Sequence, residues 1–218
     1  LARDPALLRS VNVDGTALLL DACEAARVAK VVHTSSSAVF GVPESNPVLP
    51  STVPNPVEDY GRAKLAAEWA CLDATRRGLD VTIVRPRTIL GHGRLGIFAI
   101  LFDWIADGAD VFVLGDGANT YQFVHADDLA DACRLAGASA GPAVLNVGTD
   151  RFCTMRETLE GLCRHAGTGS TVRSLPARPA SAMMRAAAAT GLALAAVEPW
   201  NSGLGGIGFM LVYLAREK

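Results

Sequence analysis

The sequence has no excess of charge of either sign. Its 20 Lys and Arg residues face 22 Asp and Glu residues, which gives a net charge of −2. The basic residues are scattered, so the chain offers no electrostatic footprint for nucleic acid or for an anionic membrane surface. Half of the 218 residues are hydrophobic, which is enough for one sizeable core or for a core with a small second lobe.

Cysteine is scarce, and its spacing suggests no pairing. No two cysteines have the spacing of metal ligands or of a redox pair, and their number is odd. This pattern fits buried free thiols in a reducing compartment, so we expect a cytoplasmic protein without a metal site. The five are Cys23, Cys71, Cys133, Cys153 and Cys163.

The sequence also lacks a signal peptide and a long uninterrupted apolar run. Residues 186–218 are apolar, but Glu198, Pro199 and Asn201 interrupt them, and the clean run 203–215 is shorter than the roughly 20 residues that a bilayer requires. An irregular chain end or a truncation is favoured over a membrane anchor. Because the chain opens on Leu1 rather than Met, we expect a piece of a longer product.

Strand and helix patterns alternate along the chain. Apolar periodicity and β-branched runs alternate in this way from residue 5 to residue 167. This alternation predicts an α/β fold with a parallel sheet. The expected helices cover 5–28, 58–77, 97–108 and 154–167, the last with Thr154 and Glu157 as a capping box; the expected strands cover 29–37, 80–86, 110–116 and 143–148, a short strand leads into a helix within 122–138, and 41–57 form a loop.

Tyr60 and Lys64 are four residues apart at the start of the predicted helix 58–77. They would share one helix face, where the ammonium favours the phenolate and brings the tyrosine pKa toward neutrality. Such a pair could move a proton on or off a substrate hydroxyl. The bare motif is common by chance, with the tyrosine half-buried and the lysine solvated. A serine run, Ser35 to Ser37, ends the strand upstream, where doubly wound sheets bind ligands, and makes the catalytic interpretation stronger.

Six motifs, in one order across most of residues 10–165, resemble the extended branch of the short-chain dehydrogenase/reductase superfamily, the NAD-dependent epimerase/dehydratase family. They are NVDGT (12–16), VVHTSSSAVFG (31–41), YGRAKLAAE (60–68), RPRTILGHG (85–93), FVHADDLADA (123–132) and LNVG (145–148). The resemblance implies a Rossmann-like doubly wound parallel sheet and NAD or NADP as cofactor. The family's first glycine-rich unit has no counterpart, so the sheet is expected to be N-terminally incomplete. Its core would cover 1–85 and 122–150, and a small substrate lobe would cover 86–121 and 151–218.

The resemblance also implies roles by position. Ser36, Tyr60 and Lys64 would be catalytic, with Tyr60 as the acid/base and Lys64 as ligand of the nicotinamide ribose. All three would contact the cofactor, together with Asn12 and Arg87. The expected substrate contacts are Ser37, Phe40, Thr88, His92 and Arg94.

Residues 91–96, GHGRLG, fit the glycine fingerprint of a dinucleotide site, follow a strand and precede an apolar helix. A cofactor there would lie away from Ser36, Tyr60 and Lys64, so these glycines are interpreted as a flexible wall of the substrate site. His92 and Arg94 then become substrate contacts, although solvated loop residues fit equally well.

The expected function is hydride transfer between NAD(P) and a secondary alcohol or ketone, with epimerisation through a transient keto intermediate as a variant. Family members that act on nucleotide sugars usually carry an asparagine and an arginine where this chain has Thr88 and Tyr121. This departure favours a smaller, more apolar small-molecule substrate. The alternatives are a nucleotide-sugar epimerase/dehydratase, a non-catalytic NAD(P)-binding sensor and an inactive fragment. No nucleic-acid or membrane partner is expected, and a homodimer stays open.

Overall fold

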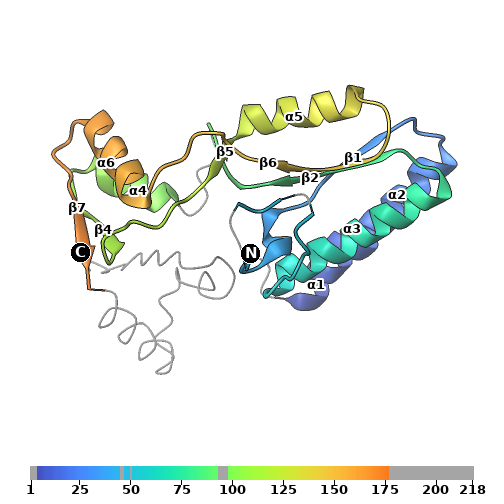
Figure 1. The fold of residues 1–218 in the computed structure, drawn as a ribbon, viewed down its shortest axis with the longest axis horizontal. Coiled ribbons are helices and arrows are strands. Elements are labelled where there is room, and N and C mark those ends of the chain that lie inside the picture. The colour runs from blue at the N-terminus through green and yellow to red at the C-terminus, as the bar shows by residue number, and fades with distance from the viewer. Residues whose placement is uncertain (1–3, 45–46, 50, 93–97, 177–218) are drawn as a thin grey trace. The chain divides into compact units, whose positions relative to one another are not determined.

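The computed structural model describes residues 4–44, 47–49, 51–92 and 98–176. These residues divide into two compact units. The first comprises residues 4–92 and 123–150, and the second comprises residues 98–122 and 151–176. Figure 1 labels their helices and strands.

The first unit is built on a parallel sheet in the order β1-β2-β6. Its strands are β1 (Val31–Thr34), β2 (Val81–Pro86) and β6 (Ala143–Val147). Helices α2 (Gly15–Ala25) and α3 (Asp59–Arg77) lie on one face, and α5 (Ala126–Ala138) lies on the other (Figure 1). A second pair of parallel strands, β3 (Thr88–Leu90) and β5 (Phe123–His125), belongs to the same unit. The predicted α/β fold with a parallel sheet is confirmed.

The core of this unit lies between α2, α3 and β2. Every residue of β2 is buried, as expected for a central parallel strand with both faces covered. Helix α3 ends at Gly78, whose left-handed φ of 110° suits glycine, and Leu79 then enters the core. The cluster comprises Leu20, Cys71, Ala74, Leu79, Val81 and Ile83.

Two predicted boundaries are wrong. The helix expected over 5–28 is broken into α1 (Pro5–Arg9), a π-helical turn η1 (Ser10–Asp14) and α2. The π-helical turn contains one extra residue, which shifts the hydrogen-bond register of the helix. The spacing of apolar residues does not reveal this shift, because apolar residues flank the turn on both sides. The strand expected over 29–37 ends at Thr34, since Ser36 caps a 3-10 turn, η2 (Ser37–Phe40).

The second unit pairs β4 (Val111–Leu114) with β7 (Val172–Leu175) in parallel, and α4 (Ala99–Ala106) and α6 (Met155–Ala166) pack against them. The predicted capping box of α6 is confirmed, because Glu157 N–H donates to Thr154 Oγ1 at 3.2 Å and Thr154 N–H donates to Glu157 Oε2 at 2.8 Å. Helix α6 buries Met155, Leu159 and Cys163, which lie one turn apart on one face.

All five cysteines are free thiols. The expected burial holds for Cys71 and Cys163, whereas Cys153 is exposed in the segment before α6, so that expectation is wrong there. Among residues 4–176 outside the gaps, no helix has both the length and the apolar character needed to cross a bilayer. The apolar stretch 186–218 lies outside the described residues.

Candidate active site

Ser36 lies immediately beyond the carboxyl end of β1. Its backbone is extended (φ −159°, ψ 149°), and its Oγ accepts a hydrogen bond from Ala38 N–H at 3.2 Å, which caps η2. The side chain is half-buried. The carboxyl end of a parallel strand in an open α/β sheet is where ligands bind. The hydroxyl predicted to be catalytic therefore stands at the edge where such a group would be used.

Helix α3 carries Tyr60 and Lys64 to the same edge. Lys64 Nζ donates a hydrogen bond to Thr34 O, the last residue of β1, at 3.2 Å. Tyr60 lies in the first turn of α3, one turn before Lys64, and both side chains are half-buried. Residues i and i+4 share a helix face. The structure thus brings the predicted dyad to the strand end that precedes Ser36.

Burial lowers the pKa of the Lys64 ammonium, while the nearby Cys71 and Glu68 act in the opposite direction. His33, on β1, is also affected: burial, with the charge of Lys64 added, lowers its pKa to about 4, although Glu68 opposes the shift. The neutral imidazole is therefore the resident form at neutral pH. Its Nε2 is buried without a hydrogen-bond partner in the described part of the chain.

Glycine allows α3 to lie against the turn after Ser36. A Cβ at Gly61 would lie 2.5 Å from Ala38 O and 2.9 Å from Pro56 Cβ, closer than real side chains approach. Gly41, at φ 57°, meets the loop in the same way, since its Cβ would lie 2.2 Å from Asn55 O. The approach at Gly61 lets the first turn of α3, with Tyr60, lie against the turn that follows Ser36, and the approach at Gly41 lets that turn lie against the loop at Asn55.

A buried ion pair stands behind these residues. Arg85 of β2 binds Glu68 of α3 through two bonds, Nε to Oε1 at 2.9 Å and Nη2 to Oε2 at 2.6 Å. Ser35 Oγ donates a third bond to Glu68 Oε1 at 2.5 Å. The guanidinium carbon of Arg85 lies 5.0 Å from the centroid of the Phe40 ring. Ser35, Phe40, Glu68 and Arg85 are each at most 7% exposed.

This buried network was not predicted from the sequence, because its members are 17 and 33 residues apart and charged residues are read as solvated. Two signals point to it. Glu68 follows Ala67 on the face of α3 that also carries Cys71, and Arg85 ends the otherwise apolar run of β2. A charge inside an apolar pattern predicts a buried partner.

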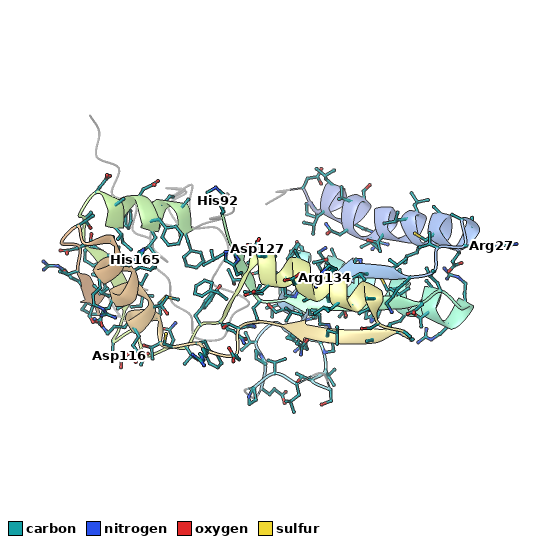
Figure 2. All side chains as sticks on the ribbon, turned by 90° about the horizontal axis from the view of Figure 1, so that it is seen from above. Arg27, His92, Asp116, Asp127, Arg134 and His165 are labelled. Carbon is teal, nitrogen blue, oxygen red and sulfur yellow. The ribbon has the colours of Figure 1, made fainter. Side chains whose placement is uncertain are left out.

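The other predicted contacts are more dispersed. Asn12 lies in the π turn η1, which packs against α3, and its Nδ2 donates to Leu8 O at 3.0 Å. Arg87 directly follows β2, and its N–H donates to Val147 O at 2.9 Å. Thr88 opens β3, and His92, labelled in Figure 2, is exposed.

Three more predicted contacts complete the set. Ser37 opens η2 and is half-buried, whereas Phe40 keeps only 4% of its surface exposed. Arg94 lies outside the described residues, as does most of the glycine segment 91–96. Gly91 itself is described, and a Cβ there would lie 2.6 Å from Ala126 Cβ, so this glycine permits close packing against α5.

The side chains at the end of β1 fit the nicotinamide end of a dinucleotide. An ammonium has three N–H donors, and Lys64 gives one to Thr34 O, within a half-buried setting suited to further hydroxyl acceptors. Ser36 adds a hydroxyl that both donates and accepts. A ribose diol and a substrate alcohol are the chemical groups that this donor set fits.

Comparison with known proteins agrees with this arrangement. The model of the NAD dependent epimerase/dehydratase family matches residues 2–148. An uncharacterised protein, y4nG, from Sinorhizobium fredii is 53% identical over 193 residues, covering 88% of this chain and 49% of the relative. A UDP-glucose 4-epimerase from Mycolicibacterium smegmatis is 36% identical over 162 residues, covering 71% of this chain and 52% of the relative.

A solved structure agrees as well. A Thermus thermophilus UDP-glucose 4-epimerase in complex with NAD superposes with a TM-score of 0.63 at 31% identity, covering 78% of this chain and 58% of that one. The chain thus spans about half the length of the curated relatives it matches. The match of the family model over most of the chain, together with these relatives, shows that the chain belongs to the NAD dependent epimerase/dehydratase family.

Proposed function

We propose that the protein is an NAD-dependent epimerase that oxidises and then re-reduces a secondary alcohol of a nucleotide sugar. The observation that carries the proposal is the hydrogen bond from Lys64 to Thr34 O. Tyr60 lies one turn before Lys64 on α3, and Ser36 lies two residues after Thr34. NAD, when bound, supplies the hydride acceptor and afterwards the hydride donor. Ser36, Tyr60, Lys64, Asn12 and Arg87 are the residues proposed to hold its nicotinamide end.

The chain's own part in the reaction is proton transfer. The Tyr60 phenolate takes the proton of the substrate hydroxyl while the carbon gives up its hydride, so that an alcohol becomes a ketone. Ser36 donates a hydrogen bond to the same oxygen and fixes its position. In the return step Tyr60 would give the proton back to the ketone oxygen, and delivery of the hydride to the opposite face would invert the configuration at that carbon.

Lys64 makes this possible at neutral pH. A phenol has an ordinary pKa of about 10, and a fixed ammonium one helical turn away favours its ionised form. The hydrogen bond to Thr34 O fixes the ammonium at the strand end. Within the described residues Lys64 donates to Thr34 O alone, which leaves further N–H donors for the ribose hydroxyls, so one side chain would both bind cofactor and tune the base.

The nucleotide-sugar substrate is supported by the relatives. Two of them, which are 36% and 31% identical to this chain over the aligned residues, are named UDP-glucose 4-epimerases. The substrate contacts that we carry forward are Ser37, Thr88, His92 and Arg94. For Phe40, the fifth predicted contact, we propose a supporting role instead, because it is 4% exposed and its ring centroid lies 5.0 Å from the Arg85 guanidinium carbon.

A second candidate substrate is a smaller or more apolar alcohol or ketone. At the position of the family's phosphate-binding arginine the chain has Tyr121, which is 3% exposed and packs edge-to-face on Phe98 with ring centroids 6.3 Å apart. A buried phenol cannot replace the bidentate contact that an arginine makes with a diphosphate. This observation favours a substrate without a diphosphate.

The test incubates the purified protein with NAD and UDP-glucose that carries deuterium at C4, and with a steroid-like secondary alcohol in a parallel reaction. We expect UDP-galactose in which the deuterium is retained, because the hydride leaves and returns within one site. Turnover of the apolar alcohol alone would establish the second candidate. Loss of the label to water, or turnover of neither substrate, would contradict the proposed function.

A further inference from the structure

We propose that Glu68, Arg85 and Ser35 form a positioning network that sets the distance between Tyr60 and Ser36, and that turnover depends on this network beyond its effect on stability. The inference rests on the proposed function. It concerns the residues that hold the relay rather than those that touch substrate.

The cost of the network is the first argument. Glu68 is 1% exposed and Arg85 is 7% exposed, so two full charges have been removed from water. An apolar pair of similar volume often serves stability equally well or better, so a buried ion pair is weak evidence for a stabilising role. Apolar partners can pack in several orientations, whereas hydrogen bonds are directional. The two parallel N–H···O bonds hold the guanidinium against the carboxylate in one geometry.

The connections of the network are the second argument. Glu68 lies one turn beyond Lys64 and two turns beyond Tyr60 on α3, so its anchoring fixes the rotation of that helix about its axis. Ser35 directly precedes Ser36, donates its hydroxyl to Glu68 and donates its N–H to Val84 O at 2.7 Å. One carboxylate therefore ties the base-bearing helix to the strand end with the catalytic hydroxyl.

Phe40 extends the network to the turn after Ser36. Its ring lies under the Arg85 guanidinium and is 4% exposed, so the end of η2 is attached to the same arginine. Reacting groups must be held within a fraction of an ångström, since a displacement of about 1 Å can cost roughly 100-fold in rate. A network that joins α3, β1, β2 and η2 meets that demand.

The test replaces both charges at once, as Glu68→Leu with Arg85→Met, so that no unpaired charge is left in the core. We expect the thermal midpoint and the NAD affinity by calorimetry to stay near those of the parent, and the substrate KM to change by less than about threefold. We expect kcat to fall by roughly 10- to 100-fold. A merely structural role would move the thermal midpoint and leave kcat unchanged.

The matched control is Asp80→Asn. It breaks the ion pair with Lys30, which joins the segments leading into the same two strands at their opposite ends. Its kcat should equal that of the parent. Arg85→Lys keeps the charge but loses the second bond, so its kcat should lie between those of the parent and the double variant.

The outcomes separate the two proposals. An active parent with a folded double variant whose kcat lies within twofold of the parent would overturn the positioning role and leave the proposed function standing. A parent without NAD-dependent turnover would overturn both. If the double variant does not fold, Ser35→Ala removes a single hydroxyl and replaces it in the test. A kcat several-fold below the parent at unchanged thermal midpoint supports the network, and an unchanged kcat overturns it.

Discussion

An ion pair lies at each end of strands β1 and β2, and the two ion pairs differ in their surroundings. Where the strands begin, Lys30 binds Asp80 at 2.8 Å, and Asp80 Oδ2 also accepts the N–H of Gly141 at 3.0 Å. The side chains there are 10% and 28% exposed. Where the strands end, the side chains of Arg85 and Glu68 are 8% and 2% exposed and have an aromatic ring and a hydroxyl as further partners.

The difference indicates what each pair does. The hydrogen bond from Lys30 lowers the pKa of Asp80, whose carboxylate keeps partial contact with water. This pair holds together the ends of three chain segments. The buried pair carries a desolvation cost, which is not needed to hold two segments together, because apolar contacts can do the same. That cost is found at the end of β1 that Lys64 contacts and that precedes Ser36, which is the end proposed to carry out chemistry.

The largest difference between the two ends should appear when one partner alone is removed. Arg85→Met leaves the Glu68 carboxylate buried without its partner, and the free energy of unfolding should fall by about 3–5 kcal/mol. Asp80→Asn should cost less, because Lys30 keeps its hydrogen bond to Gly141 O at 2.8 Å. Urea denaturation of both variants measures the contrast. Equal losses would show that the two pairs are equivalent.

A smaller effect is expected from the close approach at Gly61. Gly61→Ala would place a methyl group 2.5 Å from Ala38 O, so α3 and η2 must separate, at a cost of about 1–3 kcal/mol. Gly161→Ala is the matched control, because it lies within α6 with only the tip of Arg164 at 3.9 Å. There alanine should stabilise by up to about 1 kcal/mol. Thermal denaturation distinguishes the two signs, and stabilisation by Gly61→Ala would contradict the close approach.

The smallest effect concerns pH and His33. Its folded pKa of about 4 lies below the ordinary value of 6.5, so below pH 6.5 the unfolded imidazole takes up a proton while the folded one stays neutral. The free energy of unfolding is therefore highest above pH 6.5 and decreases as the pH falls toward 4. The free energy of unfolding should drop by roughly 1–2 kcal/mol between pH 7 and pH 5 through this residue.

His33→Phe should remove that component of the pH dependence, whereas His165→Gln, a change at an exposed residue on α6, should leave it in place. Urea denaturation at the two pH values measures the difference for each variant. An unchanged slope in His33→Phe would mean that folding does not lower the pKa of this imidazole.

The sequence predicted the elements whose pattern is local and long. Helix α3 was expected over 58–77 and spans Asp59–Arg77, because Glu58, the apolar periodicity and Gly78 all lie within its own sequence. Strand β2 was predicted from the β-branched run at residues 81–84. Strands β3 and β7 were missed because neither shows an apolar run of its own: β3 begins only one residue after β2 ends, and β7 (Val172–Leu175) has Arg173 and Ser174 at its centre.

The candidate site was predicted in part. The motif order placed Ser36, Tyr60 and Lys64 together, and the structure brings α3 onto the end of β1, although their catalytic roles stay predictions. The support behind them could not be predicted, because the contacts of Glu68 depend on how β1, β2 and α3 pack rather than on any local spacing. Register and packing are tertiary properties, and a single sequence carries little information about them.

The most direct test of the proposed relay is the single-turnover rate of Tyr60→Phe with NAD and the substrate that the deuterium experiment identifies. Removing one oxygen deletes the proton acceptor but keeps the ring, so the thermal midpoint should stay within a few degrees of the parent. The rate should fall by roughly 100- to 10,000-fold. A rate within a few-fold of the parent would show that the proton moves elsewhere and that the end of β1 is not the catalytic edge.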